Sequence, residues 1–159
     1  MATLLLVVIY IVFIGLGLPD SSIGAAWPAL HLELDLAIGL QSLISLFISG
    51  GTDIASLFSA KLVNKFGTPL VTSCSTLLSA ISLLGFALSN SLWWLLILSP
   101  FLGFGAGAID AALNNYVATH YKSSQMNFLH SFYGVGVALT PYVFSFTLYG
   151  NNDWRMGFK

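Results

Sequence analysis

The sequence predicts an all-α integral membrane protein, and its composition is the first reason. Of the 159 residues, 57% are hydrophobic and only 7% are Asp, Glu, Lys or Arg, against about 25% in an ordinary soluble domain. So few charges cannot cover the surface of a soluble domain of this size. The apolar runs are also long and continuous, whereas a membrane β-barrel shows short segments of alternating polarity. Because hydrocarbon offers no water to backbone polar groups, the chain is expected to cross as helices.

Charge placement locates the first two helices. Residues 1–19 carry no charge and form the first span. No basic region precedes this span and no small-residue cleavage site follows before Asp20, so it lacks the pattern of a signal peptide. The second span lies between an acidic pair, Glu33 and Asp35, and the first lysine, Lys61.

Two longer uncharged stretches hold the other helices. The 44 residues 66–109 carry no charge, which is too long for one span of about 20 residues. This stretch must reverse once, and Ser89-Asn90-Ser91 is the polar site that suits a tight turn. Residues 123–152 are again uncharged and hold the fifth helix. We therefore expect helices at 3–24, 37–59, 68–88, 92–119 and 126–149, with the start of a sixth near 154.

Basic residues set the predicted orientation. Lys61 and Lys65 are expected between the second and third helices, and Lys122 between the fourth and fifth. Since Lys and Arg in short loops favour the cytoplasmic side, we expect a multi-pass protein of the cell membrane with a cytoplasmic N-terminus. The final residues from Trp154 resemble the start of another helix. The sequence is therefore expected to be a fragment of a longer chain.

Several function classes are disfavoured by the composition. A net charge of −1 argues against nucleic-acid binding, which needs a basic face. The single cysteine, Cys74, excludes an intrachain disulfide and a cysteine-based metal centre. His31, Glu33 and Asp35 are alternate residues in an expected loop, which is a weak pattern for a metal site. No nucleophile–base arrangement appears, so we do not expect the protein to be an enzyme. We also expect no bound metal and no cofactor.

Acidic residues inside the expected helices are the main functional candidates. Asp20 follows Pro19 near the end of the first helix, where it either caps the helix at the interface or serves a function. Asp110 and Asn114 are four residues apart and share one side of the fourth helix. A carboxylate there is either buried against a partner or lines a wet cavity, and we favour the cavity. Asp53 is a third intramembrane acid, with no role assigned.

Small and polar residues mark the faces of the fourth and fifth helices. Gly103 and Gly107 form a G-x-x-x-G pair, which lets another helix approach closely. On the fifth helix, Asn127 lies on a face of small and polar residues, with His130 beside it. Histidine is the side chain whose ordinary pKa lies near neutral pH, so a proton relay and a purely hydrogen-bonded role are both open for His130.

Taken in order, these motifs resemble the N-terminal half of a Major Facilitator Superfamily transporter of the fucose-permease-like group. The residues that carry the resemblance lie in four places. They are Asp20, Gly24, Trp27 and Pro28; Lys65 and Gly67 within the expected loop 60–69; Gly103, Gly105, Gly107, Asp110 and Asn114; and Asn127, His130, Gly134, Gly136 and Pro141.

The resemblance implies one six-helix bundle of a twelve-helix fold, with the C-terminal half missing from this sequence. It implies secondary active transport of a small polar solute, in the first place a sugar, by alternating access with proton symport. Asp110 is then the main protonation site, and Asn114 helps to hold a polyhydroxylated substrate. Asp20 is the second candidate acid, expected at a different depth, so that no direct pair with Asp110 is expected.

Two alternatives stay open from the sequence. If five helices are the whole product, the first alternative is a non-transporting membrane subunit or a truncated remnant that packs with other helices. Less favoured is an intramembrane enzyme that uses the acids and His130.

Overall fold

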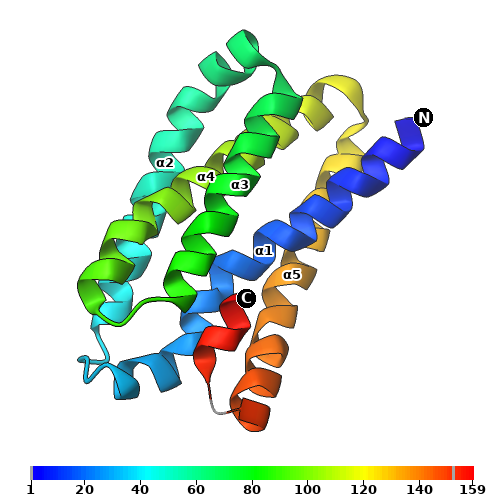
Figure 1. Cartoon of the computed structure of the whole chain (residues 1–159). Helices are drawn as coiled ribbons and strands as arrows, with labels where there is room; N and C mark the ends of the chain where they lie inside the picture. The colour runs from blue at the N-terminus through cyan, green and yellow to red at the C-terminus, as the bar shows by residue number, and fades with distance from the viewer. Residues whose placement is uncertain (1, 152) are drawn as a thin grey trace.

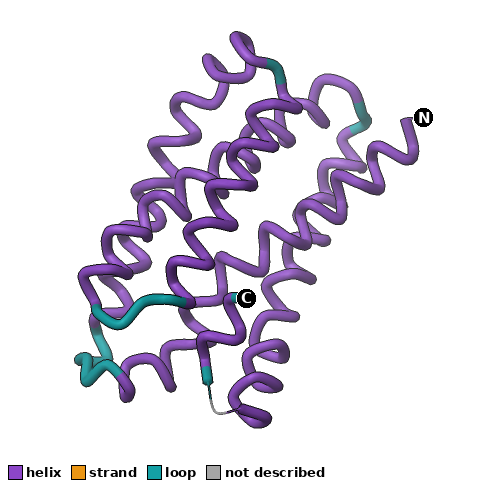
Figure 2. The backbone as a smooth tube through the Cα atoms, in the orientation of Figure 1, coloured by secondary structure: helices purple, strands orange, loops and turns teal. Residues whose placement is uncertain are grey.

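A computed structural model describes residues 2–151 and 153–159, and nearly all of them are helical (Figure 2). The elements are α1 (Ala2–Glu33), α2 (Leu40–Phe66), α3 (Thr68–Ala87), α4 (Leu92–His120), α5 (Ser123–Asn151) and the short 3₁₀ helix η1 (Trp154–Phe158). Each of the five α-helices is long and apolar enough to cross a membrane. Large apolar side chains such as Leu57, Leu77 and Phe146 are exposed on their outer faces, as lipid-facing residues are. The predicted helical membrane fold is confirmed.

α1 is longer than predicted, because it continues through two prolines to Glu33. Proline removes one backbone donor, yet a packed neighbour can stabilise a helix that contains one. Here Trp27 and Leu30, beyond the predicted end at 24, are almost completely buried in the core. Their packing extends the helix, and Asp20 consequently lies nearer to its middle than the sequence suggested.

α2 also runs past its predicted end at 59, to Phe66. Lys61 and Lys65, expected in a loop, lie on its last two turns, where cations favour a helix C-terminus. The connection to α3 is reduced to Gly67, whose φ of 81° turns the chain while its N–H donates to the Val63 carbonyl at 2.8 Å. Such a positive φ suits glycine, which has no Cβ.

The α3–α4 and α4–α5 turns fall where the sequence placed them. The chain reverses between Ala87 and Leu92, and fully buried Ser89 donates its hydroxyl to the Phe86 carbonyl at 2.8 Å. Lys122 lies in the turn between α4 and α5. Figure 1 shows the start of α1, the α2–α3 turn and the α4–α5 turn at one end of the bundle.

Glycines bring the helices together in two groups. α4 packs between α2 and α3, and α1 packs mainly against α5. A Cβ added at Gly103 or Gly107 would collide with the backbone of α2, so the predicted G-x-x-x-G face is a packing face. In the other group, a Cβ at Gly17 or Gly136 would collide with the facing backbone of the partner helix.

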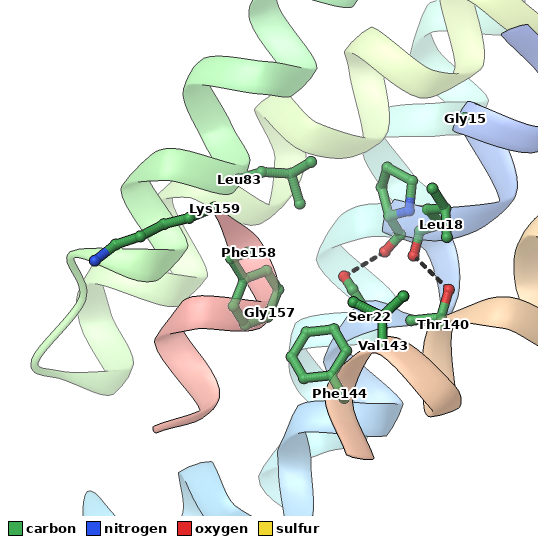
Figure 3. Close-up of a pocket in the computed structure, with 11 residues that line it drawn as sticks. Gly15, Leu18, Ser22, Leu83, Thr140, Val143, Phe144, Gly157, Phe158 and Lys159 are labelled. Atoms are coloured by element: carbon green, nitrogen blue, oxygen red, sulfur yellow. Dashed lines mark hydrogen bonds between the residues drawn. The ribbon is translucent and has the colours of Figure 1, made fainter. Parts of the chain in front are cut away.

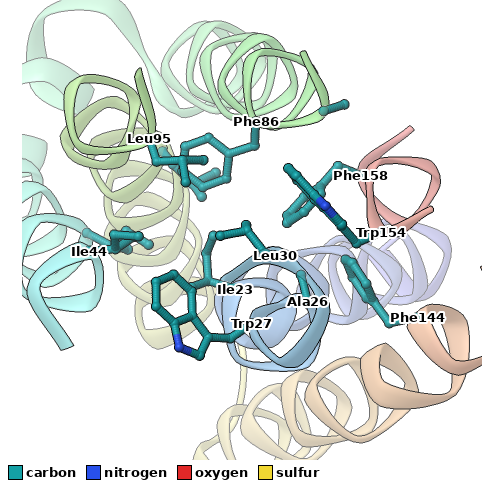
Figure 4. Packing of buried hydrophobic residues seen from close by; sticks show 13 residues of the cluster. Ile23, Ala26, Trp27, Leu30, Ile44, Phe86, Leu95, Phe144, Trp154 and Phe158 are labelled. Carbon is teal, nitrogen blue, oxygen red and sulfur yellow. The ribbon is translucent and has the colours of Figure 1, made fainter. Parts of the chain in front are cut away.

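A hydrophobic core closes the end of the bundle where the chain terminates. Figure 4 shows Leu30 of α1 pointing toward Phe86, with Trp154 and Phe158 of η1 on one side of α1 and Trp27 on the other. The Phe158 ring meets the rings of Phe86, Phe144 and Trp154 edge-on, with centroids 5.1–6.0 Å apart. Where the sequence predicted the start of a sixth helix, the described residues form η1, anchored by aromatic packing.

Arg155 connects η1 to both helix groups. Its Nη1 donates to Glu33 Oε1 at 2.6 Å, and its Nη2 donates to the Ser89 carbonyl and to Asn90 Oδ1, each at 3.2 Å. Trp154 Nε1 donates to the second oxygen of Glu33 at 2.6 Å. The end of α1 and the α3–α4 turn are thereby joined through η1. We call these residues the Glu33–Arg155 clamp.

Candidate functional site

A cavity of about 260 Å³ lies where α1, α2, α4 and α5 meet. Its lining is partly polar, and the polar side chains come from segments far apart in the sequence. Its lining consists of Leu16, Asp20, Thr52, Ala106, Gly107, Asp110, His130 and Tyr133. Three of the five candidate residues therefore meet in one place, namely Asp20, Asp110 and His130.

Asp20 and Asp110 both line this cavity, whereas the sequence analysis expected the two acids at different depths. Asp110 is half-buried, and its carboxylate interacts electrostatically with His130 and with Asp20. With α1 extended to Glu33, Asp20 reaches the same cavity as Asp110.

Asp20 is also engaged by a residue that the sequence analysis missed. The Tyr133 hydroxyl on α5 donates a hydrogen bond to Asp20 Oδ2 on α1. Tyr133 lies three residues after His130, a spacing that places both side chains on one face of a helix. That spacing is the signal that could have found it.

Asn114 supports the site from one helical turn away. Its side chain interacts with the Asp110 carboxylate, as expected for residues four apart on a helix. The Asn114 Oδ1 atom is buried and has no hydrogen-bond partner among the described residues. Asn114 is not among the residues that line the cavity, so it contacts the site through Asp110.

Asn127 and Asp53 lie elsewhere. Asn127 is exposed near the start of α5 and does not line the cavity. Asp53 is exposed on α2, whereas its neighbour Thr52 faces the cavity and donates its hydroxyl to the Gly103 carbonyl at 3.1 Å. The close contact of α2 with α4 decides this, because it turns Thr52 inward and Asp53 outward.

A second cavity, of about 220 Å³, lies between α1, α3, α5 and η1 (Figure 3). Its lining is mainly apolar, and its two hydroxyls are used on backbone carbonyls. Ser22 donates to the Pro19 carbonyl at 2.6 Å, and Thr140 donates to the Leu18 carbonyl at 3.1 Å. It offers far fewer polar groups to a solute than the cavity of Asp20 and Asp110.

Within the described residues, no cluster of three or more His, Cys, Asp or Glu side chains could hold a metal ion. Of the three residues considered for one, Glu33 is bound to Arg155 and Trp154. His31 stacks against Trp27, with ring centroids 6.0 Å apart.

A comparison with known protein families matches residues 7–159 to the Major Facilitator Superfamily. The chain belongs to the Major Facilitator Superfamily. A comparison with curated proteins returns no match. Major Facilitator Superfamily proteins are membrane transporters rather than enzymes. This membership agrees with the five apolar helices and with the polar cavity between α1, α2, α4 and α5. The chain is thus a multi-pass membrane protein of a transporter superfamily.

Proposed function

We propose that this chain forms one half of a solute pathway in a proton-coupled secondary transporter. The supporting observation is the convergence of Asp20, Asp110, His130 and Tyr133 on one cavity between four helices. Ionisable groups inside membrane spans are expensive, and they usually mark a pathway for ions or solutes. Alternating access would expose this cavity to each side of the cell membrane in turn.

Asp110 is the proposed protonation site. Its carboxylate is half-buried in α4, with His130 and Asn114 beside it. Protonation of a carboxylate in such a position removes a charge from the cavity, which changes the balance between two conformations. Solute binding and proton binding are coupled when both favour the same conformation. Asp20 is the less suited acid, because Tyr133 already donates to one of its oxygens.

The lining favours a solute that is neutral or positively charged. It contains two carboxylates, a tyrosine and a histidine, and it contains neither Lys nor Arg. Carboxylate oxygens accept hydrogen bonds from hydroxyl groups, whereas they repel anions. A small polyhydroxylated solute such as a sugar satisfies both conditions, in agreement with the resemblance to the fucose-permease-like group.

The cavity is open, so a second bundle would supply its other wall. We propose that this bundle is the C-terminal half of the same transporter, with the N-terminus of α1 in the cytoplasm. The lysines fit this orientation, because Lys61, Lys65 and Lys122 lie at the end of the bundle that also holds the start of α1.

The test is the Asp110→Asn variant of the intact gene product, expressed in cells that lack uptake of the probes. The probes are radiolabelled L-fucose, D-galactose and D-glucose. Asp110→Asn is expected to abolish accumulation against a gradient, because an amide cannot take up the coupled proton, while exchange of labelled for unlabelled sugar persists. Asp53→Asn, an exposed acid on α2, is the matched control and should accumulate normally.

Undiminished uphill uptake by Asp110→Asn rejects the proton-coupling role. If the wild type accumulates none of these probes, nor other labelled small polar solutes, a packing subunit without transport becomes the better description.

A further inference from the structure

The contact between Tyr133 of α5 and Asp20 of α1 forms part of the lining of the cavity. The phenolic hydroxyl donates to Asp20 Oδ2, and both residues line the cavity with Asp110 and His130. Hydrogen bonds to an ionised acceptor are about twice as strong as those between neutral groups. This contact therefore restricts where the Asp20 carboxylate can point.

Packing of α1 against α5 does not depend on this contact. Gly17 and Gly136 already bring the two backbones together. Ser21 donates its hydroxyl to the Val137 carbonyl at 3.2 Å, which is the acceptor that Pro141 cannot use because it has no N–H. Thr140 donates to the Leu18 carbonyl at 3.1 Å. These contacts hold the two helices together without any charged group.

The hydrogen bond occupies only one of the two carboxylate oxygens of Asp20. Oδ2 is taken by Tyr133, and the described residues supply no hydrogen-bond donor to Oδ1. Because Asp20 is exposed to the cavity, Oδ1 stays open to a donor from a solute. The Tyr133 oxygen keeps its own acceptor capacity while it donates. Two neighbouring acceptors thus face the cavity.

We propose that Tyr133 is a positioning residue that acts through Asp20, holding one carboxylate oxygen so that the other faces the solute. The inference rests on the proposed function, since it assigns a role within the same cavity. It adds a residue on α5 that sets the geometry of solute binding, separate from the proton site at Asp110.

Carboxyl labelling tests this proposal without a known solute. Dicyclohexylcarbodiimide attacks protonated carboxyl groups in membrane proteins, and mass spectrometry locates the labelled residue. Tyr133→Phe removes the donor and keeps the ring, so labelling of Asp20 in the purified intact protein is expected to rise about fivefold. Labelling of Asp110 should change much less. Tyr142→Phe, an exposed tyrosine on the same helix, is the matched control and should label as the wild type does.

Unchanged labelling of Asp20 in a folded Tyr133→Phe protein overturns the proposal. If that variant does not fold, Asp20→Ala provides the reciprocal measurement. Without its acceptor, Tyr133 should be nitrated by tetranitromethane about fivefold faster. An unchanged nitration rate would likewise overturn the proposal.

A double-mutant cycle then connects the contact to transport of the labelled sugars. Tyr133→Phe and Asp20→Asn should each raise KM by about fivefold with a smaller effect on the maximal rate. The KM of the double variant should not exceed that of the single variant with the larger effect, because both substitutions disturb the same contact. Additive effects on KM contradict action through Asp20. Because labelling needs no transport, a failed sugar panel counts against the proposed function and leaves the positioning test standing.

Discussion

Asp110 shows how a half-buried carboxylate inside a helix comes to lie beside residues from other helices. The sequence already placed Asn114 on the same side of α4, but His130 and Asp20 reach Asp110 only through the packing of α5 and α1. The buried Oδ1 of Asn114 has no partner among the residues that the structure describes, which is unusual, since most buried polar atoms in native structures have one. A bound water is the natural donor for it, because Asn114 does not line the cavity.

Asn114→Ala tests this residue. The substitution removes the amide beside Asp110 and is expected to raise KM for the labelled sugars by about fivefold. Asn115→Ala, an exposed neighbour on the same helix, is the control and should transport like the wild type. Equal KM values for the two variants, measured by initial-rate uptake, would contradict a role for Asn114.

At the scale of the helix, close approach through small residues decides the architecture. Gly136 meets the backbone of α1 at Ile14 and Gly17, whereas Gly134, two residues earlier on α5, faces open space. Helices in a membrane associate through such close packing, because lipid removes the hydrophobic driving force between them. The same helix therefore holds one glycine that packing requires and one that it does not.

This contrast gives a prediction for the stability of the α1–α5 pair. Gly136→Ala places a Cβ against the α1 backbone, which should lower the free energy of unfolding by about 1–3 kcal/mol. Gly134→Ala should be neutral or raise it by up to about 1 kcal/mol, since alanine favours the helix over glycine. Thermal unfolding of both variants in detergent measures the difference. Equal destabilisation by the two substitutions would argue against the packing described for α5.

Across the whole molecule, the Glu33–Arg155 clamp joins the two helix groups at one end. Glu33 closes α1, Ser89 and Asn90 belong to the α3–α4 turn, and Arg155 connects them from η1. The guanidinium also lies over the Trp154 ring, 4.4 Å from its centre, and such cation–π contacts add stability. Because the ion pair is partly exposed, its contribution depends on ionic strength.

Glu33→Ala is expected to loosen η1 without unfolding the bundle. The variant loses the acceptor of both the Arg155 and the Trp154 bonds, each worth about 1–3 kcal/mol when charged groups take part, and less where solvent reaches. Hydrogen exchange of residues 154–158 should accelerate, while exchange in α4 stays slow. Asp35→Asn is the control, because Asp35 is an exposed acid close to Glu33. If exchange in η1 is unchanged by Glu33→Ala, the clamp does not hold this segment.

Much of the fold could be predicted from local patterns. Long uncharged stretches, a polar Ser89-Asn90-Ser91 turn and the G-x-x-x-G pair on α4 are visible in short windows of sequence, and the structure has all three. The ends of the helices were harder to predict. α1 passes Pro19 and Pro28 because the packing of Trp27 and Leu30 supports it, and packing is not visible in a window of sequence.

The membrane class, the helical spans and most of the turns are therefore properties that the sequence alone determined, because hydropathy and charge act locally along the chain. Only the tertiary structure decided that Asp20, Asp110, His130 and Tyr133 share one cavity, with Asn127 and Asp53 outside it. The physical reason is the rotation and depth of each helix. Contacts at glycines fix the rotation and depth of each helix. They thereby bring together residues as distant in sequence as Asp20 and Tyr133, which are 113 residues apart.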